Sequence, residues 1–130
     1  MRSKSIKRRR PDDANPKDRV GVSKPPLHLI PASAEIAESI VLALGARKYQ
    51  EFNWRKADVR ASIYIAAARR HLAQWFDGQD DDPESGISHL AHVRASLGIL
   101  IDAVATGHVI DNRPPPGVAS ELIERFTDQA

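Results

Sequence analysis

The chain contains no cysteine among its 130 residues, which excludes disulfide bonds and thiolate metal sites. Carboxylates and imidazoles are therefore the strong metal ligands that this sequence offers. The longest apolar runs, such as SIYIAAA, fall far below the roughly 20 residues that a membrane-spanning helix requires. The basic N-terminus is not followed by the apolar stretch of a secretory signal. These absences predict a cytoplasmic protein without a membrane segment.

Positive charge is concentrated at the N-terminus. The first ten residues, MRSKSIKRRR, contain six basic side chains and no acidic one, whereas the rest of the chain is net negative. Residues 1–23 have almost nothing to bury, so we predict a flexible tail followed by one domain over residues 24–130. A basic tail can also contact the phosphates of nucleic acid, so weak binding through residues 1–10 is an alternative to simple disorder.

Apolar residues recur at helical spacing in three long segments, and no alternation typical of a strand reaches a useful length. We predict helices over residues 33–48, 58–77 and 84–105. A short helix over residues 118–126 is expected after the Pro-Pro-Pro-Gly sequence. The sequence therefore predicts an all-α fold, a small bundle of three longer helices and one short helix.

The second predicted helix carries apolar residues on two sides. They form two stripes: Ile65, Leu72 and Phe76, and Tyr64, Ala68, His71 and Trp75. One small chain has too few helices to cover both stripes, so we predict a homo-oligomer in which another subunit covers one of them.

The third predicted helix has a start signal and one apolar face. Asp82 is expected to cap it, with Pro83 at the first helical position. Its buried face is expected to contain five residues: Leu90, Val93, Leu97, Leu100 and Val104.

Three of the five histidines lie in the stretch RRHLAQWFDGQDDDPESGISHLAH, residues 69–92. His89 and His92 are three residues apart, so they share one face of a helix. An antiparallel helix-turn-helix would bring Arg70 and His71 to the same place. Imidazoles suit a metal and a guanidinium suits a phosphate group. The alternative is that these histidines make hydrogen bonds in the core.

Acidic residues accompany the histidines. Asp82 and Glu84 fall near the start of the third helix, while Glu35 and Glu38 lie one turn apart on the first helix and could reach a shared cation. Hard oxygen ligands combined with imidazoles suit Mg²⁺ or Mn²⁺. The alternatives are a capped, solvated turn and an exposed acidic first turn that complements the helix dipole.

The sequence GARKYQEFNW follows the first helix and supplies groups that suit a nucleotide. Lys48 could neutralise phosphate, Tyr49 and Trp54 could stack on a base, and Asn53 could bind the edge of the base with one donor and one acceptor. The alternative is a loop that its aromatic side chains pin to the core.

Taken in order, KPPLHLIP, GARKYQEFNW, RHL and GQDDDPESGISHLAH resemble the phage and bacterial dATP/dGTP diphosphohydrolase family, whose members are similar to the all-α MazG-like nucleotide pyrophosphohydrolases. The resemblance covers about residues 24–103. It implies Mg²⁺- or Mn²⁺-dependent hydrolysis of a purine deoxynucleoside triphosphate to the monophosphate and pyrophosphate.

The sequence departs from the MazG-like pattern on the third helix. A Glu-x-x-Asp cluster is expected there, but the chain has His89-x-x-His92, and Gln79 stands where the family commonly has an acid. The resemblance implies a candidate metal shell of six residues: Glu35, Glu38, Asp82, Glu84, His89 and His92. The candidate catalytic residues are His71, Glu84 and His89, of which a carboxylate or an imidazole takes the proton of the attacking water.

The leading hypothesis is an enzyme that hydrolyses deoxynucleoside triphosphates. The alternative is a nucleotide- or nucleic-acid-binding module that uses the same pocket or the basic tail without turnover. Other phosphohydrolases are disfavoured because the chain has no His-Asp dipeptide and no glycine-rich loop ending in Gly-Lys-Ser/Thr. If the pocket is functional, His89→Ala and Glu84→Ala are expected to reduce turnover by orders of magnitude while stability barely changes.

Overall fold

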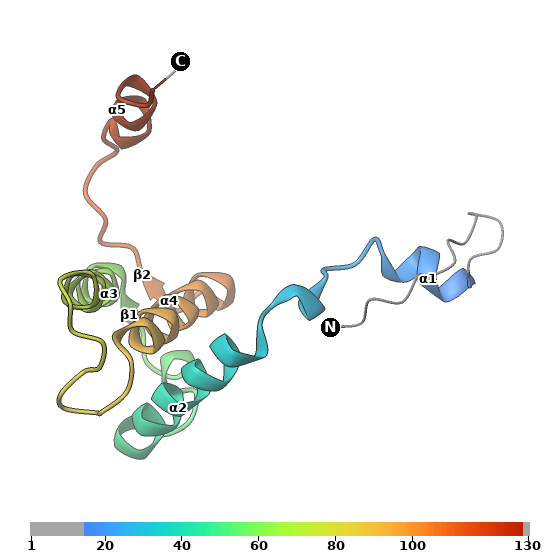
Figure 1. Ribbon diagram of the computed structural model, residues 1–130, viewed down its shortest axis with the longest axis horizontal. Helices are drawn as coiled ribbons and strands as arrows, with labels where there is room; N and C mark the ends of the chain where they lie inside the picture. Colours follow the sequence, from blue (N-terminus) through green and yellow to red (C-terminus); the bar gives the residue numbers. More distant parts are fainter. Residues whose placement is uncertain (1–14, 129–130) are drawn as a thin grey trace. The chain divides into compact units, whose positions relative to one another are not determined.

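A computed structural model of the chain describes residues 15–128. The chain divides into two units, Met1–Pro31 and Ala32–Ala130. The ribbon in Figure 1 labels the helices and strands of the chain. The basic run at residues 1–10, for which the sequence leaves nucleic-acid binding open, lies outside the described residues.

The first unit contains one short α-helix, α1 (Pro16–Gly21). Asn15 caps it by accepting a hydrogen bond from the backbone N–H of Lys17 at 2.8 Å, and proline occupies the first helical position. This helix lies within the segment predicted to be flexible. That prediction was based on the lack of residues to bury and did not consider the Asn-Pro start signal. The 3₁₀-helix η2 (Leu27–Leu29) follows.

The second unit is built on three longer helices, α2 (Ala32–Tyr49), α3 (Ala61–Phe76) and α4 (His89–Thr106). Helix α4 packs against both α2 and α3 (Figure 1). A shorter helix, α5 (Ala119–Arg125), lies near the C-terminus. The predicted all-α class is therefore confirmed. None of the described helices is long and apolar enough to cross a membrane.

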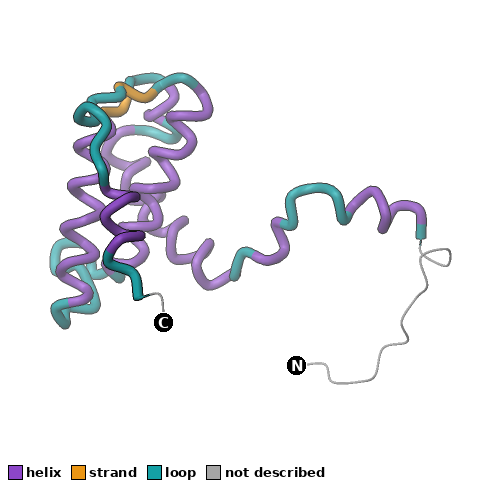
Figure 2. The backbone as a smooth tube through the Cα atoms, turned by 90° about the horizontal axis from the view of Figure 1, so that it is seen from above, coloured by secondary structure: helices purple, strands orange, loops and turns teal. Residues whose placement is uncertain are grey.

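Two short strands join segments that lie far apart in the sequence. β1 (Val59–Arg60) and β2 (Val109–Ile110) pair in parallel, and Figure 2 shows them at one end of the helices. Beside them the amide of Asn112 accepts from the backbone N–H of Ser62 at 2.9 Å and donates to its hydroxyl at 2.7 Å. The segment after α4 is thereby fixed to the start of α3.

The core around α4 is built mainly from small side chains. The buried apolar residues of the second unit are Val59, Ala61, Ala68, Ala91, Val93, Ala95 and Ala103. Val93 is buried as predicted and Leu100 is half-buried. The prediction that Leu90, Leu97 and Val104 face the core is wrong, since they are 42%, 38% and 61% exposed. Alanine allows helix axes to approach closely, so the alanine face of α4 packs inward and these side chains turn outward.

The start of α4 differs from its predicted position at residue 84. The helix begins at His89, and the Ser88 hydroxyl caps it by accepting from the backbone N–H of Leu90 at 3.1 Å. Asp82 instead accepts from the backbone N–H of Ser85 at 3.1 Å, and Gly86 has a φ of +74°, which ends this turn before the helix begins. The prediction of Pro83 as the first helical residue is therefore wrong, and the acidic side chains lie in a structured loop.

Candidate functional site

His71 of α3 and His89 and His92 of α4 form a histidine cluster in the second unit. The Nδ1 atoms of His71 and His89 are 2.8 Å apart. The rings of His71 and His92 stack with centroids 4.5 Å apart and planes at 8°. The side chain of His89 is fully buried. The structure thus brings together the three histidines that the sequence singles out.

Gln79 determines which nitrogen of the buried His89 donates a hydrogen bond. The carbonyl oxygen of Gln79 lies 2.7 Å from Nε2 of His89, and because a carbonyl only accepts, His89 donates from Nε2. In a neutral His89, Nδ1 then accepts the hydrogen bond that His71 donates. Both nitrogens of His89 are engaged, so this geometry does not support its predicted role as a metal ligand.

The loop before α4 contacts the histidine cluster through Ser85 and Asp82. The hydroxyl of Ser85 lies 2.7 Å from Nε2 of His92. The carboxylate of Asp82 lies 3.6 Å from the same nitrogen. Ser85 also accepts from the backbone N–H of Ile87 at 3.2 Å, so one hydroxyl orders both the loop and the imidazole.

The protonation states of this site follow from burial and neighbouring charge. Burial lowers the pKa of His71, and the nearby His92 and His89 lower it further. Burial also lowers the pKa of His92, although Asp82 opposes that effect. For Asp82, burial acts to raise the pKa, but hydrogen bonds from Ser85 and the neighbouring imidazoles bring it below its usual range. At neutral pH His71 and His92 are therefore neutral beside the ionised carboxylate of Asp82.

Acidification is expected to destabilise the fold. The pKa values of His71 and His92 are lower in the folded protein than the ordinary value of 6.5, so the unfolded chain binds more protons as the pH falls below 6.5. Their contribution is fully present above 6.5 and is lost as the pH falls through the folded-state values. The pKa of Asp82 is also lowered in the folded protein, so its contribution to stability is likewise lost on acidification, at lower pH than that of the histidines. Thermal melts should give a lower Tm at pH 5 than at pH 7.5, and His71→Gln should flatten this slope; equal slopes in both proteins would contradict the assignment.

A cavity of about 360 Å³ lies beside the histidine cluster, and we call it the acidic cavity. Its lining residues are Val41, Leu44, Gly45, Lys48, Tyr49, Asp82, Glu84, Ser85 and His92. Lys48 at the end of α2 therefore shares one cavity with the two carboxylates of the loop before α4. This combination of one cation and two anions suits a polyphosphate that binds with a metal ion.

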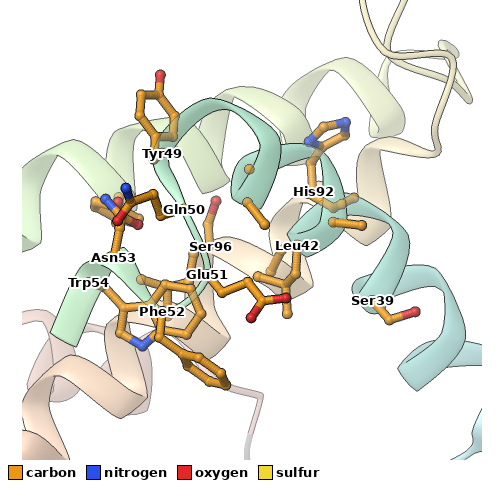
Figure 3. Close-up of a pocket in the computed structure, with 17 residues that line it drawn as sticks. Ser39, Leu42, Tyr49, Gln50, Glu51, Phe52, Asn53, Trp54, His92 and Ser96 are labelled. Carbon is orange, nitrogen blue, oxygen red and sulfur yellow. The ribbon is translucent and has the colours of Figure 1, made fainter. Parts of the chain in front are cut away.

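A second cavity of about 450 Å³ adjoins the first, and we call it the aromatic cavity (Figure 3). Its lining residues are Ser39, Val41, Leu42, Ala43, Gly45, Ala46, Tyr49, Gln50, Glu51, Phe52, Asn53, Trp54, Tyr64, His92, Ala95, Ser96 and Ile99. Tyr49 and His92 line both cavities. In Figure 3, His92 lies on one side of the aromatic cavity, and Asn53 and Trp54 lie on the other.

The structure leaves five of the predicted site residues outside both cavities: His71 and His89 of the histidine cluster, and Glu35, Glu38 and Arg70. Glu35 and Arg70 are exposed on α2 and α3. Glu38 accepts a hydrogen bond from Nε of Arg94 at 2.9 Å, so its carboxylate is paired with a guanidinium. Within residues 15–128, no group of three histidine, aspartate or glutamate side chains is spaced to hold a metal ion.

Gly98 makes room for the ion pair between Glu38 and Arg94. A Cβ atom at position 98 would lie 2.5 Å from Oε2 of Glu38, closer than real contacts allow. The absence of a side chain on this turn of α4 therefore lets the carboxylate of α2 approach. Nothing near Arg94 in the sequence indicates this role, because its partner is 56 residues away.

Two further residues of the site were missed or misinterpreted from the sequence. Ser85 was overlooked, although its place three residues after Asp82 in the DPES turn is typical of a backbone-capping motif. Gln79 was noted only as a departure from the family pattern, whereas its carbonyl orients His89. An uncharged acceptor at this position satisfies the hydrogen bond of the buried imidazole without adding a buried charge.

Together the fold and the two cavities define a small all-α protein whose site has an aromatic half and a charged half. The family profile described as "dATP/dGTP diphosphohydrolase, N-terminal" matches residues 14–113, and the chain therefore belongs to this family. It is 30% identical over 91 residues to a dATP/dGTP diphosphohydrolase of Salmonella phage PMBT28. That alignment covers 70% of this chain but only 29% of the phage protein. No solved structure is significantly similar to the chain.

Proposed function

We propose that the protein hydrolyses purine deoxynucleoside triphosphates, of the dATP or dGTP kind, to the monophosphate and pyrophosphate. In this reaction water attacks the α-phosphorus, the bond from that phosphorus to the bridging oxygen breaks, and pyrophosphate leaves. The name of the related phage protein and the family match support this class of activity. The observation that carries the proposal is the adjoining pair of cavities, because a nucleotide likewise has an aromatic end and a charged end.

The base is assigned to the aromatic cavity. Tyr49, Phe52 and Trp54 offer rings against which a purine can pack, and Asn53 offers one donor and one acceptor to its edge. Because Tyr49 lines both cavities, a nucleotide whose base lies near it can extend its phosphates toward Lys48.

The triphosphate is assigned to the acidic cavity, where a divalent cation fits the donor set. Mg²⁺ and Mn²⁺ prefer oxygen ligands, and Mg²⁺ is commonly held by one or two carboxylates together with substrate phosphates. Asp82, which is ionised at neutral pH, and Glu84 would hold the cation here. When bound, the cation would neutralise phosphate charge and acidify the attacking water. Lys48 would contribute a further positive charge.

His92 is assigned as the group that accepts the proton of the attacking water. It lines both cavities, and burial lowers its pKa, which favours the neutral form required of a base. His71 is predicted from the sequence to be catalytic. It lines neither cavity, and its ring stacks on the ring of His92. His71 and His89 are therefore assigned to orienting His92.

Product analysis tests this function directly. The full chain is incubated with each of the four deoxynucleoside triphosphates in the presence of Mn²⁺ or of EDTA. The expected products are deoxynucleoside monophosphate and pyrophosphate, formed faster from purines and only without EDTA. Tight binding of nucleotide without any product would overturn the enzymatic proposal in favour of a binding module, and equal turnover of pyrimidines would overturn the assignment of the base.

We also propose that the protein forms a homo-oligomer. In one stripe of α3, Ala68 is buried and His71 contacts α4, although Trp75 at the end of this stripe is 38% exposed. In the other stripe, Ile65, Leu72 and Phe76 are all exposed. Phe76 is 87% exposed, and such apolar surface is typical of subunit contacts. Light scattering should give a mass of at least twice the 14.4 kDa of one chain. A monomer at micromolar concentration would contradict the proposal.

A further inference from the structure

The segment from Gln50 to Trp54 forms one wall of the aromatic cavity, and all five of its residues line that cavity. Gln50 has a φ of +76° and Phe52 a φ of +55°. Residues other than glycine adopt this left-handed conformation at a cost in free energy, so surrounding contacts must hold the segment in place. The segment ends within the short 3₁₀-helix η3 (Asn53–Arg55).

Asp102 of α4 supplies these contacts. Its Oδ2 accepts from the indole N–H of Trp54 at 2.7 Å and from Nε of Arg55 at 2.8 Å. Its Oδ1 accepts from Nη2 of Arg55 at 3.0 Å, which completes a bidentate pair. One carboxylate on α4 thus binds Trp54, the last residue of the cavity wall, and Arg55, which directly follows it.

We propose that Asp102 and Arg55 are positioning residues for recognition of the base. Neither residue lines either cavity, so both act through Trp54 and through the backbone of the wall. The inference rests on the proposed function, since it assumes that the base occupies the aromatic cavity. It assigns selectivity for the base to a contact that does not touch the substrate.

The expected kinetic effect follows from where the wall lies. His92 and the acidic residues at the phosphates belong to other segments, so a loosened wall should leave the reacting groups in place. Binding of the base then weakens equally in the substrate complex and in the transition state, which raises KM and leaves kcat nearly unchanged. Discrimination between purines and pyrimidines should fall together with the affinity.

Three variants of the full chain test the proposal. Asp102→Asn removes the charge of the acceptor, and Arg55→Gln removes the bidentate pair while leaving the bond from Trp54. Arg55 is half exposed, with its side chain 50% accessible, so its replacement should not prevent folding. Asp111→Asn is the matched control, because Arg113 donates to Asp111 through two bonds of 2.7 Å and neither residue lines a cavity.

Two readouts are needed: steady-state kinetics with dATP and dGTP, and amide hydrogen exchange without nucleotide. Asp102→Asn and Arg55→Gln should raise KM by about tenfold with kcat within about threefold of the wild type. Exchange should accelerate at the amides of Arg55, Lys56 and Ala57, which bond to carbonyl groups of Phe52 and Asn53. The control should change neither quantity.

The possible failures are distinguishable. Turnover by the wild type combined with an unchanged KM in both variants would overturn the positioning role and leave the proposed function intact. Faster exchange without a change in KM would show that Asp102 and Arg55 order the wall but that substrate binding does not depend on this order. That result would also overturn the inference. Absence of turnover by the wild type would overturn the proposed function and, with it, the role assigned to Asp102.

Discussion

Glu84→Gln is expected to reduce the turnover of dATP or dGTP by at least about 100-fold, because it removes a carboxylate that holds the divalent cation in the acidic cavity. Glutamine keeps the size of the side chain and removes its charge. Glu84 is exposed and lies in a loop, so the melting temperature should stay within about 2 °C of the wild type. Rates should be measured over a range of Mn²⁺ concentrations, and the half-maximal concentration should rise in the variant.

Glu121→Gln provides the control for this substitution. Glu121 lies in α5, is exposed, and lines neither cavity, so the same loss of charge should leave turnover unchanged. Asp82→Asn should also reduce turnover, since the carboxylate of Asp82 lines the acidic cavity as well. Full activity of Glu84→Gln at limiting Mn²⁺ would remove Glu84 from the metal site, whatever the stability of the variant.

His89→Ala is expected to lower the free energy of unfolding by about 2 to 4 kcal/mol. The side chain is fully buried, so alanine leaves a cavity and deprives both Gln79 and His71 of a hydrogen-bond partner. This corrects the expectation from the sequence that stability would barely change, which assumed a histidine at the edge of a pocket. Denaturant unfolding measures the effect, and activity per folded molecule should fall as well because His71 no longer supports His92.

His28→Ala is a suitable comparison, since His28 lies in the first unit and is exposed. It should leave the free energy of unfolding within about 0.5 kcal/mol of the wild type. A His89→Ala variant as stable as the wild type would show that the hydrogen-bond chain from Gln79 through His89 to His71 contributes nothing to the fold.

Features encoded in short stretches of sequence could be predicted. Helical periodicity located α2, α3 and α4, and the antiparallel arrangement of α3 and α4 accounts for the meeting of His71 with His89. Lys48 and Tyr49 of the motif GARKYQEFNW lie in the last turn of α2 and line a cavity together with acidic loop residues; their contact with a nucleotide stays a prediction.

Contacts between distant residues could not be predicted from the sequence. Arg55 and Asp102 are 47 residues apart, and neither has a local signal that indicates its partner. Glu38 has the spacing of a metal ligand but is paired with Arg94, a choice that depends on the space above Gly98. The start of α4 was misplaced because Asp82 and Pro83 have the composition of a helix cap, while the turn closed by Ser85 and Gly86 competes with it.

The pairing of β1 with β2 has a consequence for the order in which the chain folds. It joins Val59 to Val109, and the contact between Ser62 and Asn112 spans a similar loop of 50 residues. Closing such a loop costs more chain entropy than forming the α3–α4 hairpin, whose ends are joined by a short loop. The hairpin and its three histidines are therefore expected to assemble early, whereas the strand pair and the wall held by Asp102 close late. A nascent chain would thus assemble its histidine cluster and the acidic loop that precedes α4 before the aromatic wall closes.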